Sequence, residues 1–213
     1  MQRFTVVVVC DGNICRSPLL ELALQDRLPE AHFAVRSAGL TPLIGHPMDP
    51  QMQRVATAAG LHPTAFRASS FDPRLAGMAD LVLTMTVAQR DAVVGRAPRL
   101  LRRTLSLSEA LNNLAPEPVI GRPDDSQIDR SPIETMRQLV RVAVARRSTT
   151  RLTADDDVPD PYQGDDALFE AVGHRLLAAA GTLADRWIAI TSTVASPGPV
   201  GVRIDHGSIE VGR

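Results

Sequence analysis

The sequence predicts an α/β fold in which helices cover both faces of a parallel β-sheet. Residues 3–10 are almost continuously apolar and β-branched, and residues 79–85 are also apolar, a pattern typical of strands buried on both faces. Segments in which apolar residues recur at helical spacing lie between the predicted strands. This alternation of strands and helices is typical of a parallel sheet wound by helices.

The first half of the chain supplies the predicted sheet. Ser17 is expected to cap the first helix, with Pro18 as its first residue, and Gly60 is expected to end the second helix. A short helix follows the third strand and leads into the fourth. The predicted strands are 3–10, 33–39, 79–85 and 102–108, and the predicted helices are 18–28, 48–60 and 86–95.

The second half begins with residues 112–129, which are rich in proline and turn formers and predict a loop or a mobile connection. A helix over 131–147 follows, because Ser131 is a cap, Pro132 takes the first helical position and Glu134 completes a capping box. Apolar residues at spacings of three and four predict a last helix. That helix spans 165–190, residues 191–201 resemble a linker, and 202–211 are either a hairpin or not ordered.

Composition excludes several classes of protein. A chain of 213 residues with 44% apolar residues is long enough for one domain with extensions. The net charge of -1 gives no footprint for nucleic acid or an anionic membrane surface. The first residues lack a signal-peptide pattern, and no apolar run reaches membrane-spanning length, so we expect a cytoplasmic protein. The histidines show no metal-ligand spacing, so we expect neither a metal nor another cofactor.

The loop after the first strand, Cys-Asp-Gly-Asn-Ile-Cys-Arg-Ser, carries the chemistry. Both cysteines of the chain lie in it, which indicates reactive thiols in a reducing compartment. A loop that ends at a helix amino terminus favours a bound anion, and Gly12 and Asn13 allow its amides to converge. Arg16 adds donors suited to phosphate oxygens. The same field predicts a depressed pKa for Cys10, which would make it a nucleophile.

Attack on a phosphate monoester also needs an acid for the departing oxygen and a base that later activates water. Asp160 in Val-Pro-Asp-Pro-Tyr-Gln-Gly is the predicted carboxylate, and Tyr162 could form an aromatic wall beside a planar leaving group. The nearby run of Asp155, Asp156 and Asp157 is interpreted as a solvated acidic loop.

These residues resemble the low-molecular-weight protein tyrosine phosphatases. The resemblance is carried by Cys-x5-Arg-Ser at residues 10–17, and by the later segments 37–40, 45–50, 79–86 and 160–164 in the same order. It implies a flavodoxin-like, three-layer α/β sandwich with a four-stranded parallel sheet. It also implies a catalytic domain over 1–190, with an inserted connection at about 112–154 and a flexible tail over 191–213.

The resemblance further implies a protein-tyrosine phosphatase that acts on phosphorylated proteins through a phosphocysteine intermediate. Cys10 would be the nucleophile, Arg16 the phosphate ligand, and Asp160 the general acid and then base. Asn13, Ser17 and Ser37 would hold the loop by hydrogen bonds, and Cys15 would form a reversible disulfide with Cys10. The predicted substrate-binding residues are Asp11, Gly12, Asn13, Ile14, Cys15, Ser17, Leu43 and Tyr162.

Asp11 departs from the family pattern, in which an apolar or neutral residue follows the nucleophile. A carboxylate there should oppose binding of a dianion unless its side chain points away. Ile14 favours phosphotyrosine over phosphoarginine, for which relatives carry threonine, although Asp11 could attract a guanidinium. The alternatives are therefore a protein-arginine phosphatase or a noncatalytic module that senses phosphate or binds a partner. Arsenate reduction is disfavoured because no cysteine follows Cys15. The oligomeric state is left open.

Overall fold

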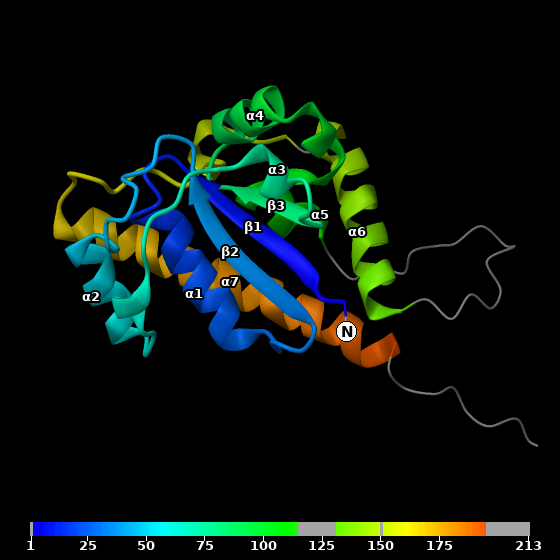
Figure 1. The fold of residues 1–213 in the computed structure, drawn as a ribbon, viewed down its shortest axis with the longest axis horizontal. Helices are drawn as coiled ribbons and strands as arrows, with labels where there is room; N and C mark the ends of the chain where they lie inside the picture. Colours follow the sequence, from blue (N-terminus) through cyan, green and yellow to red (C-terminus); the bar gives the residue numbers. More distant parts are fainter. Residues whose placement is uncertain (1, 115–130, 150, 195–213) are drawn as a thin grey trace, which may run out of the picture.

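The computed structural model describes residues 2–114, 131–149 and 151–194 (Figure 1). Four parallel strands form one sheet in the order β2-β1-β3-β4, which confirms the predicted fold class. The strands are β1 (Phe4–Cys10), β2 (Phe33–Gly39), β3 (Leu81–Thr84) and β4 (Thr104–Ser106). The α-helices are α1 (Arg16–Arg27), α2 (Pro50–Ala58), α3 (Pro73–Ala76), α4 (Val87–Arg96), α5 (Leu107–Asn113), α6 (Pro132–Arg146) and α7 (Asp166–Val194).

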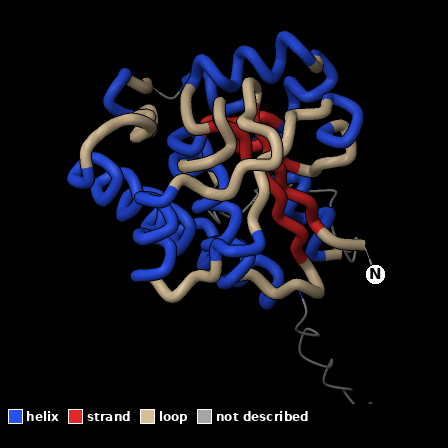
Figure 2. Tube along the Cα trace, turned by 60° about the vertical axis from the view of Figure 1, so that its left-hand side comes forward, coloured by secondary structure: helices blue, strands red, loops and turns tan. Residues whose placement is uncertain are grey.

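Helices lie on both faces of the sheet, as Figures 1 and 2 show. Alternate residues of β1 point to opposite faces, so Val8 joins the core under α1 and α7, whereas Val9 joins the core under α3 and α4. Burial on both faces explains why β1 is an unbroken run of valines and not an alternating pattern. The position of β1 between β2 and β3 fixes where its carboxyl end lies.

The amino-terminal end of the sheet is closed by an aromatic cluster. Phe4 and Phe33 are partners across β1 and β2, and their rings meet edge to face at 6.1 Å. Trp187 of α7 stacks on Phe33 at 6.0 Å and contacts Phe4 at 6.2 Å. All three side chains are buried, so α7 is fixed against the sheet at this end.

The carboxyl ends of β1 and β3 form the switch point of the sheet. β1 and β3 are neighbours, but the chain leaves β1 for α1 on one face and β3 for α4 on the other. In open α/β sheets, ligands bind in the crevice that such a divergence leaves beyond the strands. The loop that begins at Cys10 occupies this position.

Several predicted boundaries are wrong at their ends. Ser17 does not cap α1, because the helix begins at Arg16 and the Ser17 hydroxyl contacts the Cys10 thiol instead. β4 is shorter than predicted because Ser106 and Glu109 form a capping box that starts α5. That helix, and the short α3, were not predicted.

The helices α6 and α7 were predicted, but α7 runs to Val194, so residues 191–194 are helical and not part of the predicted linker. Ser131 caps α6 by accepting a hydrogen bond from the Glu134 N–H, and α6 packs against α5 and α7. Gly60 follows α2 with a φ of 80°, a left-handed conformation suited to glycine. Most of the predicted loop over 112–129 lies outside the described residues. Almost all of the predicted tail, and all of the predicted hairpin, also lie outside them. Among the described helices, none combines the length and apolar character needed to cross a bilayer.

The close approach of β2 to the Cys10 loop gives a testable prediction. A Cβ on Gly39 would lie 2.4 Å from the Asp11 carbonyl oxygen and 2.8 Å from Pro42 Cβ. We therefore expect Gly39→Ala to lower the free energy of unfolding by about 1–3 kcal/mol, measured by urea denaturation.

Gly95→Ala is the matched control. An added Cβ at Gly95, within α4, has no neighbour within 4 Å. Alanine should stabilise the helix there by about 0.5–1 kcal/mol, so the two variants should move in opposite directions. Equal stability of Gly39→Ala and the wild type would show that the loop tolerates displacement.

Candidate active site

The loop after β1 is held in place by the segment that follows β2. Four carbonyls of the loop accept backbone hydrogen bonds from this segment. The pairs are Leu40 N–H to Cys10 at 2.9 Å, Thr41 to Asp11 at 3.1 Å, Leu43 to Gly12 at 3.1 Å and Asp49 to Ile14 at 2.8 Å. The loop conformation is therefore fixed by main-chain contacts that do not depend on a ligand.

Asn13 organises the interior of the loop. Its backbone is left-handed, with a φ of 53°, and its side chain is fully buried. Its side-chain amide donates to the Ser17 hydroxyl at 2.9 Å and to the Ser37 hydroxyl at 2.8 Å, and its oxygen accepts from the Ser69 N–H at 2.8 Å. Ser37 in turn donates to the Glu21 carboxylate at 2.6 Å. Asn13, Ser17 and Ser37, which the resemblance predicted to hold the loop, are therefore linked by hydrogen bonds.

The Cys10 thiol lies at the centre of this network and is 2% exposed. Its sulfur is 2.9 Å from the Ser17 hydroxyl. Because that hydroxyl already accepts from Asn13, its own proton is free to point at the sulfur. The backbone N–H groups of Asn13 and Ser17 also lower the pKa of the thiol. Donors therefore converge on the atom predicted to be the nucleophile.

The predicted depression of the Cys10 pKa is not found in the structure. Burial raises the pKa of the thiol, and this effect outweighs the Ser17 hydroxyl, the Arg16 charge and the two amides, which all lower it. The sequence showed the donors but not the loss of water around a sulfur that is almost wholly enclosed. The charge of Arg16 is also shared with carboxylates, as the next contacts show.

Arg16 links the loop to a distant part of the chain. Its guanidinium donates from Nη1 to the Val158 carbonyl at 3.2 Å and from Nη2 to the Asp160 carboxylate at 2.6 Å. The same Nη2 lies 3.4 Å from the Asp11 carboxylate. Arg16 is 3% exposed, and its Nε is buried without a partner among the described residues. A buried donor without an acceptor is suited to a ligand anion.

The segment that carries Asp160 is fixed to the loop after β3. The Val158 N–H donates to the Met85 carbonyl at 3.0 Å, and the Asp157 carboxylate accepts from the Val87 N–H at 2.9 Å. The second oxygen of Asp160 accepts from the Tyr162 N–H at 3.2 Å. The acidic run around Asp157 was predicted to be solvated, but here one of its carboxylates anchors the segment to α4.

A cavity of about 220 Å³ opens at this point. Ser17 lies beneath it and does not line it, and Thr41, which was not predicted, does. Leu43 and Tyr162 lie at its mouth, 37% and 47% exposed, so both can contact a ligand. Its lining residues are Cys10, Asp11, Gly12, Asn13, Ile14, Cys15, Arg16, Thr41, Leu43, Asp160 and Tyr162.

Cys15 is a free thiol beside the nucleophile position. Burial raises its pKa strongly, and the charges of Asp49 and Asp160 raise it further. Burial and the two carboxylates therefore hold the Cys15 thiol neutral.

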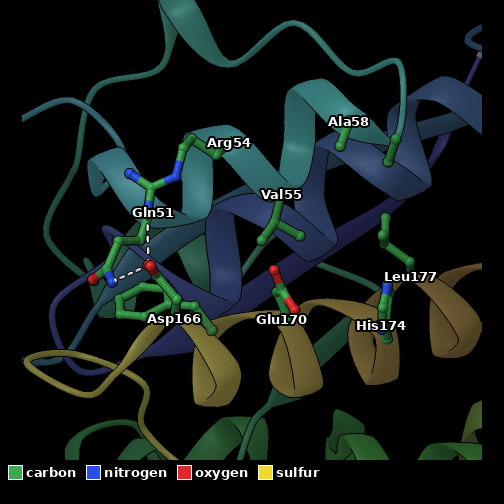
Figure 3. A pocket seen from close by; sticks show the side chains of 10 residues that line it. Gln51, Arg54, Val55, Ala58, Asp166, Glu170, His174 and Leu177 are labelled. Carbon is green, nitrogen blue, oxygen red and sulfur yellow. Dashed lines mark hydrogen bonds and ion pairs between the residues drawn. The ribbon is translucent and has the colours of Figure 1, made fainter.

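A larger cavity, of about 660 Å³, lies between α2 and α7 (Figure 3). Gln51 and Arg54 of α2 contact the Asp166 carboxylate of α7 at 2.7 Å and 2.6 Å, which lowers the pKa of Asp166. No residue of the Cys10 loop lines this cavity. Size alone therefore does not identify the site, and the smaller cavity has the chemistry.

Sequence reasoning missed two buried side chains near the site. Gln89 of α4 donates to the Asp11 carboxylate at 2.5 Å, and the Glu21 carboxylate ends the hydrogen-bond chain that starts at Cys10. Burial raises the pKa of Glu21. The one sequence signal for Gln89 is its position in the first turn of α4, the helix that follows β3. Because β3 is the neighbour of β1, this turn lies near the loop after β1. Within the described residues, no three histidine, cysteine or acidic side chains are close enough to hold a metal ion.

Comparison with known proteins identifies the family. The family described as low molecular weight phosphotyrosine protein phosphatase matches residues 5–117. A Ralstonia nicotianae protein named probable low molecular weight protein-tyrosine-phosphatase EpsP is 37% identical over 105 residues, which are 49% of this chain and 71% of the relative.

Solved structures extend the likeness to most of the chain. The tyrosine phosphatase Wzb from Escherichia coli K30, in complex with sulphate, has 26% identity and a TM-score of 0.60, and the match covers 86% of this chain and 98% of Wzb. The YwlE arginine phosphatase from Geobacillus stearothermophilus shares the fold, with a TM-score of 0.67, 21% identity and coverage of 92% and 99%. The chain thus belongs to the low molecular weight phosphotyrosine protein phosphatase family.

Proposed function

We propose that this protein hydrolyses phosphomonoesters, with phosphotyrosine in proteins as its substrate, through a phosphocysteine intermediate at Cys10. One observation carries the proposal: a thiol surrounded by hydrogen-bond donors, a buried arginine with a free Nε and a half-exposed carboxylate lie at one small cavity. Family membership and the phosphatases among its relatives support the same reaction.

Arg16 would bind the substrate phosphate. The anion gains the unpartnered Nε and competes with Asp160 for Nη2 of the same guanidinium. Phosphate binding would therefore release the carboxylate from its 2.6 Å contact with Arg16. A released Asp160 can face the ester oxygen and take or give a proton.

The reaction then takes two steps. The Cys10 thiolate attacks phosphorus, the ester P–O bond breaks, and Asp160 gives its proton to the departing oxygen. In the second step Asp160 removes a proton from water, the water oxygen attacks phosphorus, and the P–S bond breaks to release phosphate and the thiolate. The Ser17 hydroxyl and the Asn13 and Ser17 amides would stabilise the thiolate in both steps.

The walls of the cavity favour an aromatic ester. Leu43 and Tyr162 provide an aliphatic and an aromatic surface at the mouth, and the buried Ile14 adds another apolar contact. Phosphoarginine is the alternative substrate, because two carboxylates, Asp11 and Asp160, flank the phosphate ligand Arg16.

Substrate class and nucleophile are tested together. Phosphate release is measured with phosphotyrosine, phosphoarginine and phosphoserine peptides, and the rate should be greatest for phosphotyrosine. Cys10→Ser should abolish release from every peptide. Phosphate should still bind to this variant, as measured by calorimetry. Turnover by Cys10→Ser would exclude the phosphocysteine. A preference for phosphoarginine would show that the protein is an arginine phosphatase. Absence of turnover with every peptide would favour the noncatalytic module.

Asp160→Ala tests the acid. The loss of kcat should grow with the pKa of the leaving phenol, because a poor leaving group needs the proton more, and on the order of 10²–10⁴-fold is expected for the poorest. A series of aryl phosphates measures this dependence. An equal loss across the series would argue against proton donation by Asp160.

Ser17→Ala tests the thiolate. The Ser17 hydroxyl lowers the pKa of Cys10, so its removal should raise that pKa further. The rate of Cys10 alkylation by iodoacetamide, followed by mass spectrometry, should therefore rise at higher pH than in the wild type. Ser131→Ala, at the distant start of α6, is the control, and an unmoved profile for Ser17→Ala would contradict the assigned contact.

A further inference from the structure

The Asp11 carboxylate lies between Gln89 of α4 and the guanidinium of Arg16. Its Oδ2 accepts from Gln89 Nε2 at 2.5 Å. Gln89 is 5% exposed, and its Oε1 accepts from the Met85 N–H at 3.1 Å, so the amide is oriented with its nitrogen toward Asp11. The carboxylate itself remains about half exposed, at 47%. A buried amide thus fixes the direction of an accessible negative charge.

This charge lies where the reaction cavity meets a second, more open cavity, of about 420 Å³, which we name the α4 groove. Asp11, Arg16 and Asp160 line both cavities, so the two are adjacent. The groove walls are largely apolar and small. They include Leu40, Ala88, Ala92, Val158 and Pro159.

The charges of the groove are mostly negative. Among the described residues, Asp11, Asp157 and Asp160 line it, and Arg16 is the one cation of the lining. Once a phosphate occupies Arg16, the carboxylates no longer share that cation. Arg96 and Arg175 lie nearby, but they donate to the carbonyls of Leu40 and Asp157 and neither lines the groove. The groove then favours a positive group beside the bound phosphate.

We propose that the α4 groove takes an arginine or lysine side chain adjacent to the phosphorylated residue of the substrate polypeptide, and that Asp11 determines this preference. The aliphatic stem would pack on Ala88, Ala92 and Val158 while the charged end reaches Asp11. Gln89 is the positioning residue for that carboxylate. The inference rests on the proposed phosphatase function and adds the sequence context of its substrate.

The experiment uses two sets of three phosphotyrosine peptides. In one set the residue before the phosphotyrosine is arginine, alanine or glutamate, and in the other set the residue after it is varied in the same way. The wild type should prefer arginine over glutamate in kcat/KM by about 1.5–5-fold, the range expected for a partly exposed ion pair. The preference should shrink at 1 M salt, because exposed charges are screened. Equal kcat/KM for the three peptides, at both positions, would overturn the inference.

Variants assign the preference to its residues. Asp11→Asn keeps an acceptor for Gln89 but removes the charge, so the ratio of arginine to glutamate peptide should fall to about 1. Gln89→Met removes the hydrogen bond that directs Asp11 and should reduce the same ratio. Asp91→Asn, an exposed change on α4 outside the groove, is the matched control and should keep the wild-type ratio. A full preference in Asp11→Asn would assign it to another residue and overturn the role of Asp11.

A failure here can be told from a failure of the proposed function. Hydrolysis of p-nitrophenyl phosphate, which has no residue to place in the groove, is measured on the same samples. Turnover of this ester with no preference among the peptides overturns only the groove. Absence of turnover for the ester and for every peptide overturns the phosphatase proposal, and the inference with it.

Discussion

The site depends on one buried charge, the guanidinium of Arg16. A cation removed from water must be paired, and Arg16 finds its partners in Val158, Asp160 and Asp11. Two of these partners lie more than 140 positions later in the sequence. The need to pair this cation therefore connects the loop after β1 with the segment before α7. These partners bind only Nη1 and Nη2, and Nε of Arg16 has no partner among the described residues. The contacts that pair the cation therefore leave one donor for a bound anion.

Local patterns predicted the fold well because strand composition and the alternation of strands and helices indicate the same architecture. The unbroken valines of β1 predicted a central strand, and the alternation with helices predicted the parallel sheet. Boundaries failed where a side chain has two possible uses. Ser17 is a good capping residue, yet its hydroxyl contacts Cys10. Ser106 ends β4 and its hydroxyl also caps α5, so the strand stops there.

The candidate site was predictable as a set of residues but not as an electrostatic arrangement. Each residue of the Cys10 loop could be named from the motif, because the motif is contiguous. The contact of Gln89 with Asp11 joins positions 78 apart and depends on β1 and β3 being neighbours, which a strand pattern does not specify. The raised pKa of Cys10 likewise depends on burial by distant segments. Long-range placement, rather than residue type, is what the sequence leaves open.

The single tryptophan and the single tyrosine lie at opposite ends of β1. Trp187 is buried against Phe4 at the start of the strand, and Tyr162 is exposed at the mouth of the cavity beyond its end. A seven-residue strand separates them by roughly 20 Å. Tryptophan emission therefore reports on the integrity of the aromatic cluster and not on occupancy of the site. The protein carries two intrinsic optical probes, one for its core and one for its ligand.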